Sequence, residues 1–71
     1  MSDTAIINGR NRAMIEEEIA YLRDDNIVMR KIINSESDPA TVRECEQRFQ
    51  ANTDQIRSLQ RDLISVVSAD F

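Results

Sequence analysis

Residues 42–66 read VRECEQRFQANTDQIRSLQRDLISV. Along this stretch, residues at alternating steps of three and four form a row of eight positions, and seven of the eight are apolar. The row consists of Val42, Cys45, Phe49, Asn52, Ile56, Leu59, Leu63 and Val66. This spacing is typical of the seam along which one α-helix packs against another at a shallow angle. The second half of the chain is therefore predicted to be one long helix that needs a helical neighbour.

A matching row lies in the first half of the chain. It consists of Ile15, Ile19, Leu22, Asn26, Met29 and Ile33. Between the two rows, residues 34–39 read NSESDP, and Asp38 can cap a helix that begins with Pro39, because the first helical position does not need the N–H that proline lacks. So short a connection makes two long helices antiparallel neighbours. We therefore predict an all-α fold, an antiparallel two-helix hairpin of the coiled-coil kind.

The chain is predicted to form a single domain of five consecutive segments. They are an N-terminal arm or helix extension at 1–8, helix one at 9–34, a turn at 35–38, helix two at 39–68 and a C-terminal tail at 69–71. The start of helix one stays open, because Asn8-Gly9 is one possible boundary and Asp3 is another possible cap. Apolar residues at 63–67 extend past the secure part of helix one. They need a cover, which Ile6 and Ile7 or a partner chain can supply.

A domain of 71 residues buries little surface and usually needs support beyond its own core. Cys45 is the single cysteine, so an intramolecular disulfide is not available. The sequence contains no histidine, which excludes a zinc site of the common Cys/His kind. We therefore expect support from association, either as a homodimer that forms a four-helix bundle or by docking on a partner protein.

Two polar residues, Asn26 and Asn52, interrupt the apolar rows. Folding the chain about Glu36-Ser37 places them in adjacent layers, where they can hydrogen-bond to each other or to their copies in a second chain. A buried asparagine at a seam position is a well-attested device for fixing helix register and oligomeric state. We assign that role to Asn26 and Asn52; the alternative is that one or both point outward at a loose part of the seam.

Helix one carries more apolar surface than one neighbouring helix can cover. A second column consists of Met14, Tyr21, Val28 and Ile32, with Ile27 nearby. If the first row closes the hairpin, the second column is left for a partner, so we predict that it forms the partner interface. The alternative is a slightly rotated hairpin whose core takes in Tyr21 and Val28.

The formal charge is −4, from thirteen acidic and nine basic residues. Eight of the nine bases are arginines, which alternate with acids along both helices. We interpret them first as salt-bridge partners of these acids. The acidic balance does not favour a phosphate-binding surface.

We do not expect an enzyme. The sequence contains no histidine, no serine or cysteine nucleophile beside a plausible base and no glycine-rich phosphate loop, and Glu16 to Glu18 are consecutive, so on a helix they diverge instead of converging on one ion. We accordingly expect no cofactor and no metal. No apolar run reaches the roughly 20 residues that cross a bilayer, and no cleavable leader is evident, so we expect a soluble cytoplasmic protein without a membrane partner.

Two functional classes remain. The first is a small protein-interaction module, such as an adaptor, an assembly subunit, a chaperone-like partner or an inhibitor, which acts through its helical surface. The alternative is a dimeric helical-hairpin regulator that binds folded RNA. Its binding face would comprise Asn11, Arg12, Arg43, Gln47, Gln50, Arg57 and Arg61. The acids interleaved with these residues argue against a nucleic-acid partner.

Overall fold

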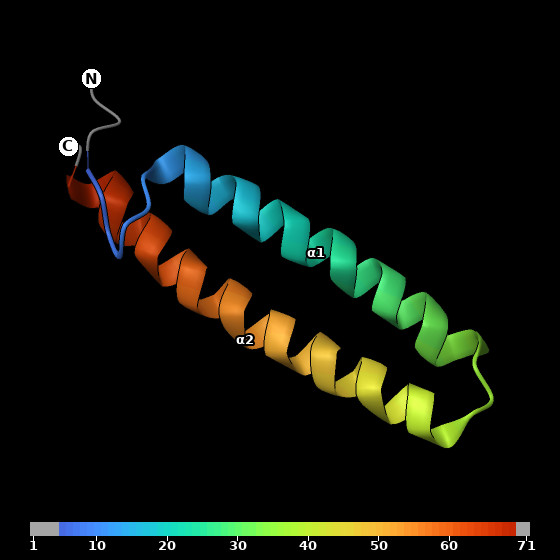
Figure 1. Cartoon of the computed structure of the whole chain (residues 1–71). Coiled ribbons are helices and arrows are strands. Elements are labelled where there is room, and N and C mark those ends of the chain that lie inside the picture. Colours follow the sequence, from blue (N-terminus) through green and yellow to red (C-terminus); the bar gives the residue numbers. More distant parts are fainter. Residues whose placement is uncertain (1–4, 70–71) are drawn as a thin grey trace.

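The computed structural model describes residues 5–69. Two helices make up most of this segment: α1 spans Arg12–Ser35 and α2 spans Pro39–Ala69. They lie side by side and run in opposite directions, and together they form a rod of 50 × 15 × 14 Å (Figure 1). The described residues contain no β-structure beyond one isolated bridge, so the predicted all-α hairpin is confirmed.

The start of α1 lies at Arg12 and not at residue 9, because Asn11 is its N-cap. Asn11 has an extended backbone, and its side-chain oxygen accepts a hydrogen bond from the Met14 N–H at 3.0 Å. This bond satisfies one of the four N–H groups that the first turn of a helix leaves without a partner. Residues 1–4 of the predicted arm and residues 70–71 of the predicted tail lie outside the described residues.

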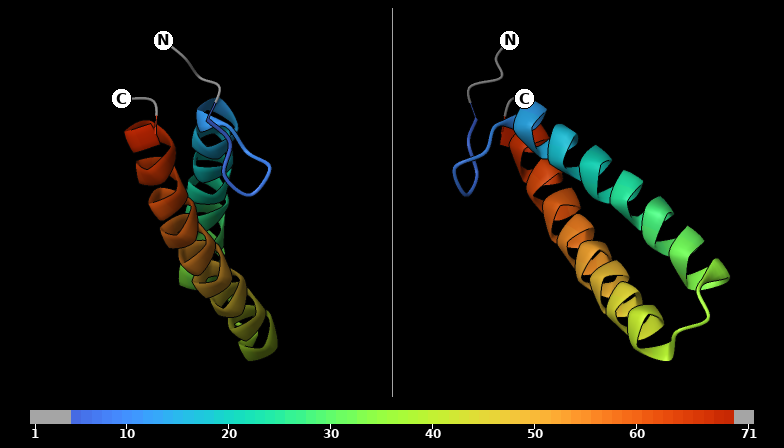
Figure 2. Two further views of the ribbon diagram at one scale, coloured as in Figure 1. Left: turned by 90° about the vertical axis from the view of Figure 1, so that its left-hand side faces the viewer. Right: turned by 45° about the vertical axis from the view of Figure 1, so that its right-hand side comes forward.

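A tight turn precedes this cap. Asn8 and Gly9 both have left-handed backbones, with φ of 54° and 77°. Ile7 and Arg10, on either side, exchange backbone hydrogen bonds of 2.9 and 3.0 Å. Asn-Gly is the preferred sequence for a two-residue turn with two left-handed positions, because neither residue is strongly penalised there. Figure 2 shows the turn as a loop beside the helices, at the end opposite to the connection between α1 and α2.

That connection, residues 36–38, satisfies the backbone at both adjoining helix ends. The Glu36 N–H donates to the Ile32 carbonyl at 2.8 Å and so closes α1. At the start of α2, the Asp38 carboxylate accepts a hydrogen bond from the Thr41 hydroxyl at 2.8 Å. This bond, together with one from the Ala40 N–H, lowers the pKa of Asp38.

The core is concentrated at the end of the rod that carries the Asn8-Gly9 turn. Its fully or almost fully buried members are Ile15, Ile19, Leu59 and Val66. Ala5 and Ile7 pack against this cluster, so the arm covers the end of α2 as a folded turn and not as an extension of α1. Towards the connection, Met29 is the one buried apolar side chain among the described residues. The core is therefore thinner there.

Candidate interaction surface

A row of apolar side chains runs along the outside of α1. Met14, Tyr21 and Val28 follow one another at steps of seven residues and are 49%, 63% and 49% exposed, while Ile32 at the end of the row is half-buried. We call these four residues the outer row. Steps of seven residues are close to two full helical turns, which keeps the side chains on one side of the helix. The alternative of a rotated hairpin is wrong, because its core would have to bury Tyr21 and Val28.

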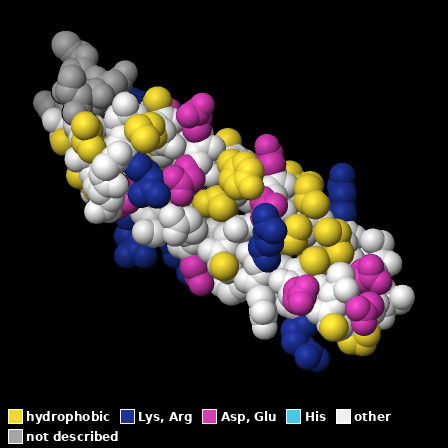
Figure 3. All heavy atoms as spheres, viewed as in Figure 1, with side chains coloured by type: hydrophobic (Ala, Val, Ile, Leu, Met, Phe, Trp, Pro, Cys, Tyr) yellow, Lys and Arg dark blue, Asp and Glu magenta, His cyan; other side chains and the backbone are white. Residues whose placement is uncertain are grey.

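The outer row is exposed because the seam of α1 is already occupied. Ile15 and Ile19 face α2 and are 0% and 6% exposed, whereas Met14, one residue before Ile15, is turned about 100° away from it. Figure 3 shows hydrophobic side chains at intervals along the α1 side of the rod, with acidic side chains between them. The apolar surface of α1 is therefore divided between the core and the outer row.

Acidic side chains lie on both sides of the outer row. Glu17 and Asp24 are on the side away from α2 and are exposed. Glu18, on the side towards α2, is half-buried and accepts bonds from the Arg10 guanidinium at 2.7 and 3.4 Å and from the Gln55 amide at 3.3 Å. The arm and α2 thus both hold Glu18 in place.

Asp25 is the fourth acid beside the outer row and the centre of a network between the helices. Its carboxylate accepts two hydrogen bonds from Arg48, at 2.7 and 3.1 Å, and one from the Asn52 side chain at 2.7 Å. These bonds, that of Asn52 foremost, lower the pKa of Asp25. The Asp25 carboxylate in turn raises the pKa of Arg48, to which Tyr21 makes a smaller contribution. The network therefore favours a charged Asp25 and places Arg48 close to the outer row.

The two seam asparagines do not bond to each other. Asn52 is buried and donates to Asp25, while Asn26 donates from its Nδ2 to the Thr53 hydroxyl at 3.3 Å. The Thr53 hydroxyl donates onward to the Phe49 carbonyl at 2.9 Å. The Asn26 Oδ1 is buried and has no hydrogen-bond partner among residues 5–69. Each asparagine thus bridges α1 and α2 separately, Asn52 through Asp25 and Asn26 through Thr53.

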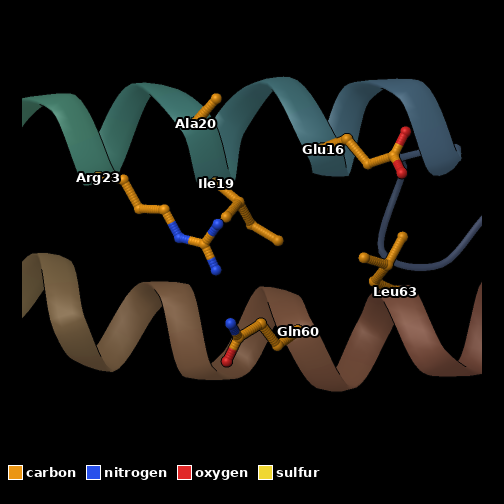
Figure 4. Close-up of a pocket in the computed structure, with 6 residues that line it drawn as sticks. All are labelled: Glu16, Ile19, Ala20, Arg23, Gln60 and Leu63. Carbon is orange, nitrogen blue, oxygen red and sulfur yellow. The ribbon is translucent and has the colours of Figure 1, made fainter.

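Shallow hollows lie on the other side of the seam. The first, about 280 Å³, is drawn in Figure 4: Ile19 and Leu63 point towards each other across it, Arg23 extends from α1 towards Gln60 of α2, and Ala20 points away. The second hollow measures about 460 Å³. Asn26, Ile27, Arg30, Lys31 and Phe49 line it. Its apolar floor includes the Phe49 ring, which the Arg30 guanidinium covers at 4.8 Å from the ring centre.

Most of the arginines do not have the salt-bridge partners that we expected. Within residues 5–69, the ion pairs are Arg10 with Glu18, Arg12 with Glu16, and Arg48 with Asp25. The expectation is wrong for the others in this segment. They are Arg23, Arg30, Arg43, Arg57 and Arg61, and all five are exposed. On α2, residues 43, 57 and 61 share the outward face, so their guanidinium groups are available to solvent.

The sequence interpretation missed two elements of this surface. The first is the contact of Arg10 with Glu18, which depends on the turn at Asn8-Gly9; the signal was the Asn-Gly pair itself, which favours a tight turn over a helix start. The second is the pairing of Asp25 with Arg48. That pairing depends on the register of the helices to within one turn, and no local sequence signal reports it.

Neither described helix has a stretch apolar enough for a membrane span, and no three acidic or cysteine side chains of residues 5–69 are grouped as a metal site would require. Comparison of the chain with protein-family models, with curated proteins and with solved structures finds no match.

Proposed function

We propose that this protein is a non-enzymatic interaction module, which docks through the outer row of α1 onto another protein or onto a second copy of itself. The observation that carries the proposal is the exposure of Met14, Tyr21 and Val28 in one straight row. Apolar side chains in register on one helix face are the anchors by which an amphipathic helix enters a groove or pairs with another helix. Docking on a second hairpin would give a four-helix bundle.

The polar groups around the row support a binding role and not a catalytic one. The carboxylates of Glu18 and Asp25 each accept hydrogen bonds from an arginine and an amide, and for Asp25 these bonds lower the pKa and so favour its charged form. A general acid or base must itself release or take up a proton during the reaction. Because these bonds hold the two carboxylates in place, we interpret them as a fixed polar border of the outer row.

Affinity capture from the cells that make the protein tests the proposal. The Tyr21→Glu, Val28→Glu double variant places two charges in the row, whereas Ile64→Glu is a matched control, because Ile64 is 67% exposed on α2 and lies outside the row. We expect the wild type and the control to retain the same stoichiometric partner and the double variant to lose it. Capture of the same proteins by all three chains would refute the proposal.

One observation favours the second candidate, an RNA-binding regulator. Arg43, Arg57 and Arg61 are exposed on α2 and, within residues 5–69, make no ion pair, so their charges are free to contact phosphates. Asp54 lies among them and weakens the positive potential. Phosphate contacts make affinity fall steeply with salt, because bound counterions are released. Binding of folded RNA that is lost at high salt and in a variant with glutamine at all three arginines would support this candidate, and salt-insensitive capture of a protein would exclude it.

A further inference from the structure

We infer that the outer row binds a basic amphipathic helix of another protein and not a second copy of this chain. The inference rests on the proposed docking function and identifies the partner by its chemistry. Its basis is the acidic border of the row, which Glu17 and Asp24 form on one side and Glu18 and Asp25 on the other.

The two sides of this border differ in how their charge is balanced. Towards α2, Glu18 is paired with Arg10 and Asp25 with Arg48. On the opposite side, Glu17 and Asp24 are exposed and, within residues 5–69, form no ion pair. Lys31 is also exposed and follows Glu17 and Asp24 on this side at the same heptad spacing, so four acids against three bases leave a net charge of about −1 around the row. The unbalanced acids are at positions 17 and 24, one heptad apart.

A second copy does not balance the charge of Glu17 and Asp24 in the two arrangements that bring the whole outer row together, because in both of them Lys31 lies away from these acids. In an antiparallel pair of α1 helices centred on Tyr21, Glu17 of one copy lies opposite Asp24 of the other. In a parallel pair, the side of the row with Glu17 and Asp24 faces the side with Glu18 and Asp25 of the other copy, so acids again meet acids. Like charges opposed in this way disfavour association. The outward face of α2 offers no apolar row to fill the contact, because the large exposed apolar residue described on α2 is Ile64 alone. Homodimerisation through the outer row is therefore disfavoured in each of these arrangements.

The row fixes the length and chemistry of the expected partner segment. From Met14 to Val28 the axial distance is about 21 Å, so a helix of roughly 20 residues covers the row and its border. That helix needs apolar residues at heptad spacing to meet Met14, Tyr21 and Val28. It needs lysine or arginine beside them to reach Glu17 and Asp24, about 10 Å apart along the axis. Arginine has the further advantage that it can stack on the exposed ring of Tyr21.

Tyr21 provides a direct readout, because it is the single tyrosine and the chain contains no tryptophan. The probes are two synthetic 21-residue amphipathic helical peptides free of tyrosine and tryptophan. Both have leucine at the heptad positions; the first has lysine at the flanking positions and the second has glutamate. We expect the lysine peptide to change the Tyr21 emission saturably, and to bind at least tenfold more tightly than the glutamate peptide.

Charge exchange on the protein makes the test specific. In the Glu17→Lys, Asp24→Lys variant the preference should reverse, whereas the Glu44→Lys, Asp54→Lys variant, with the same charge change on the exposed face of α2, should keep the wild-type preference. Equal binding of both peptides to every chain would leave docking intact but overturn the charge inference. Sedimentation equilibrium that shows a dimer abolished by Tyr21→Glu would identify a second copy as the occupant and also overturn it. If neither peptide binds and no dimer depends on the row, the charge inference is overturned; the proposed function fails as well only if the Tyr21→Glu, Val28→Glu double variant also captures the same proteins as wild type.

Discussion

The Nδ2 of Asn52 donates a 2.7 Å hydrogen bond to Oδ2 of Asp25 and so joins the buried seam of α2 to the acidic border of the outer row on α1. The same carboxylate accepts two bonds from Arg48, whose side chain is 56% exposed. Asn52 therefore contributes both to the packing of the helices and to the position of an acid on the surface. A polar side chain at this place fixes the relative position of the helices and also the direction of a charged group that a partner would meet.

The stability of the hairpin should fall in acid, because the pKa values of Asp25 and Asp38 are lowered from the ordinary 3.8 in the folded chain. A group of this kind contributes stability that is fully present above its unfolded pKa and is lost as the pH falls through the lower folded pKa. We expect the free energy of unfolding to decrease below about pH 4. Urea titrations at fixed ionic strength between pH 2 and pH 7 measure this dependence.

The variants Asp25→Asn and Asp38→Asn should each reduce the decrease in the free energy of unfolding at low pH, that is, flatten the acid limb of this profile. The double variant should flatten it further, because the two carboxylates lie far apart and act independently. Asn52→Ala, which removes the main cause of the lowered pKa of Asp25 but keeps that carboxylate, should give a smaller flattening than Asp25→Asn. An acid limb unchanged in all of these variants would show that these carboxylates do not govern acid stability.

The two seam asparagines should respond differently to replacement by leucine. The buried Asn26 Oδ1 has no partner within residues 5–69, and such a group costs about 1–3 kcal/mol. Asn26→Leu removes this cost, whereas Asn52→Leu removes the bond between Asn52 and Asp25 and leaves that carboxylate with one donor fewer. We expect the Asn26→Leu chain to melt at a higher temperature than the Asn52→Leu chain in thermal unfolding followed by circular dichroism.

Sedimentation equilibrium of the same two variants addresses the assigned role in register and oligomeric state. If Asn52 fixes the register, Asn52→Leu should broaden the distribution of species or change the mass of the particle relative to wild type. If both variants kept the wild-type mass and melted at the same temperature, neither the difference in stability nor the role in register would hold.

The sequence predicts the hairpin because periodicity reports a helix face directly. The row from Val42 to Val66 and its counterpart from Ile15 to Ile33 predict two paired helices. The same helical periodicity also predicts the outer row of α1. The contacts across the seam are harder to predict from the sequence, because a shift of one helical turn between α1 and α2 changes which acid meets Arg48. The absence of partners for Arg57 and Arg61 within residues 5–69 depends on the same register, and the alternation of charges along the chain does not reveal it.

Gly9→Ala should loosen the arm. Gly9 has φ of +77°, and a Cβ built there meets no atom within 4 Å, so the substitution tests backbone conformation without a steric clash. A left-handed conformation costs a non-glycine residue about 1–2 kcal/mol. We expect faster amide hydrogen exchange at Ile7 and Arg10, whose N–H groups close the turn, with little change in the middle of α2.

The control for this experiment is Asn8→Gly, which keeps the left-handed turn but removes the bond from Asn8 to Asp62 at 3.2 Å. If exchange at Ile7 rises equally in both variants, the side-chain contact and not the backbone of the turn holds the arm. If exchange is unchanged in both, packing of Ala5 and Ile7 on the core is sufficient to hold it.

Met14 and Ile15 are neighbours in sequence but should have separable effects on binding and on stability. Ile15 is fully buried, and truncation of a buried isoleucine to alanine costs about 2–5 kcal/mol, a large part of the stability of so small a domain. Met14 is half exposed, and Met14→Ala should change the free energy of unfolding by no more than about 0.5 kcal/mol, because alanine suits a helix surface. In the Tyr21 fluorescence titration with the lysine peptide, we expect Met14→Ala to weaken binding while the melting temperature stays near that of wild type. If Met14→Ala bound the peptide as tightly as wild type, the contact would not extend to the N-terminal end of the outer row, and the expected partner helix would have to be centred nearer Val28.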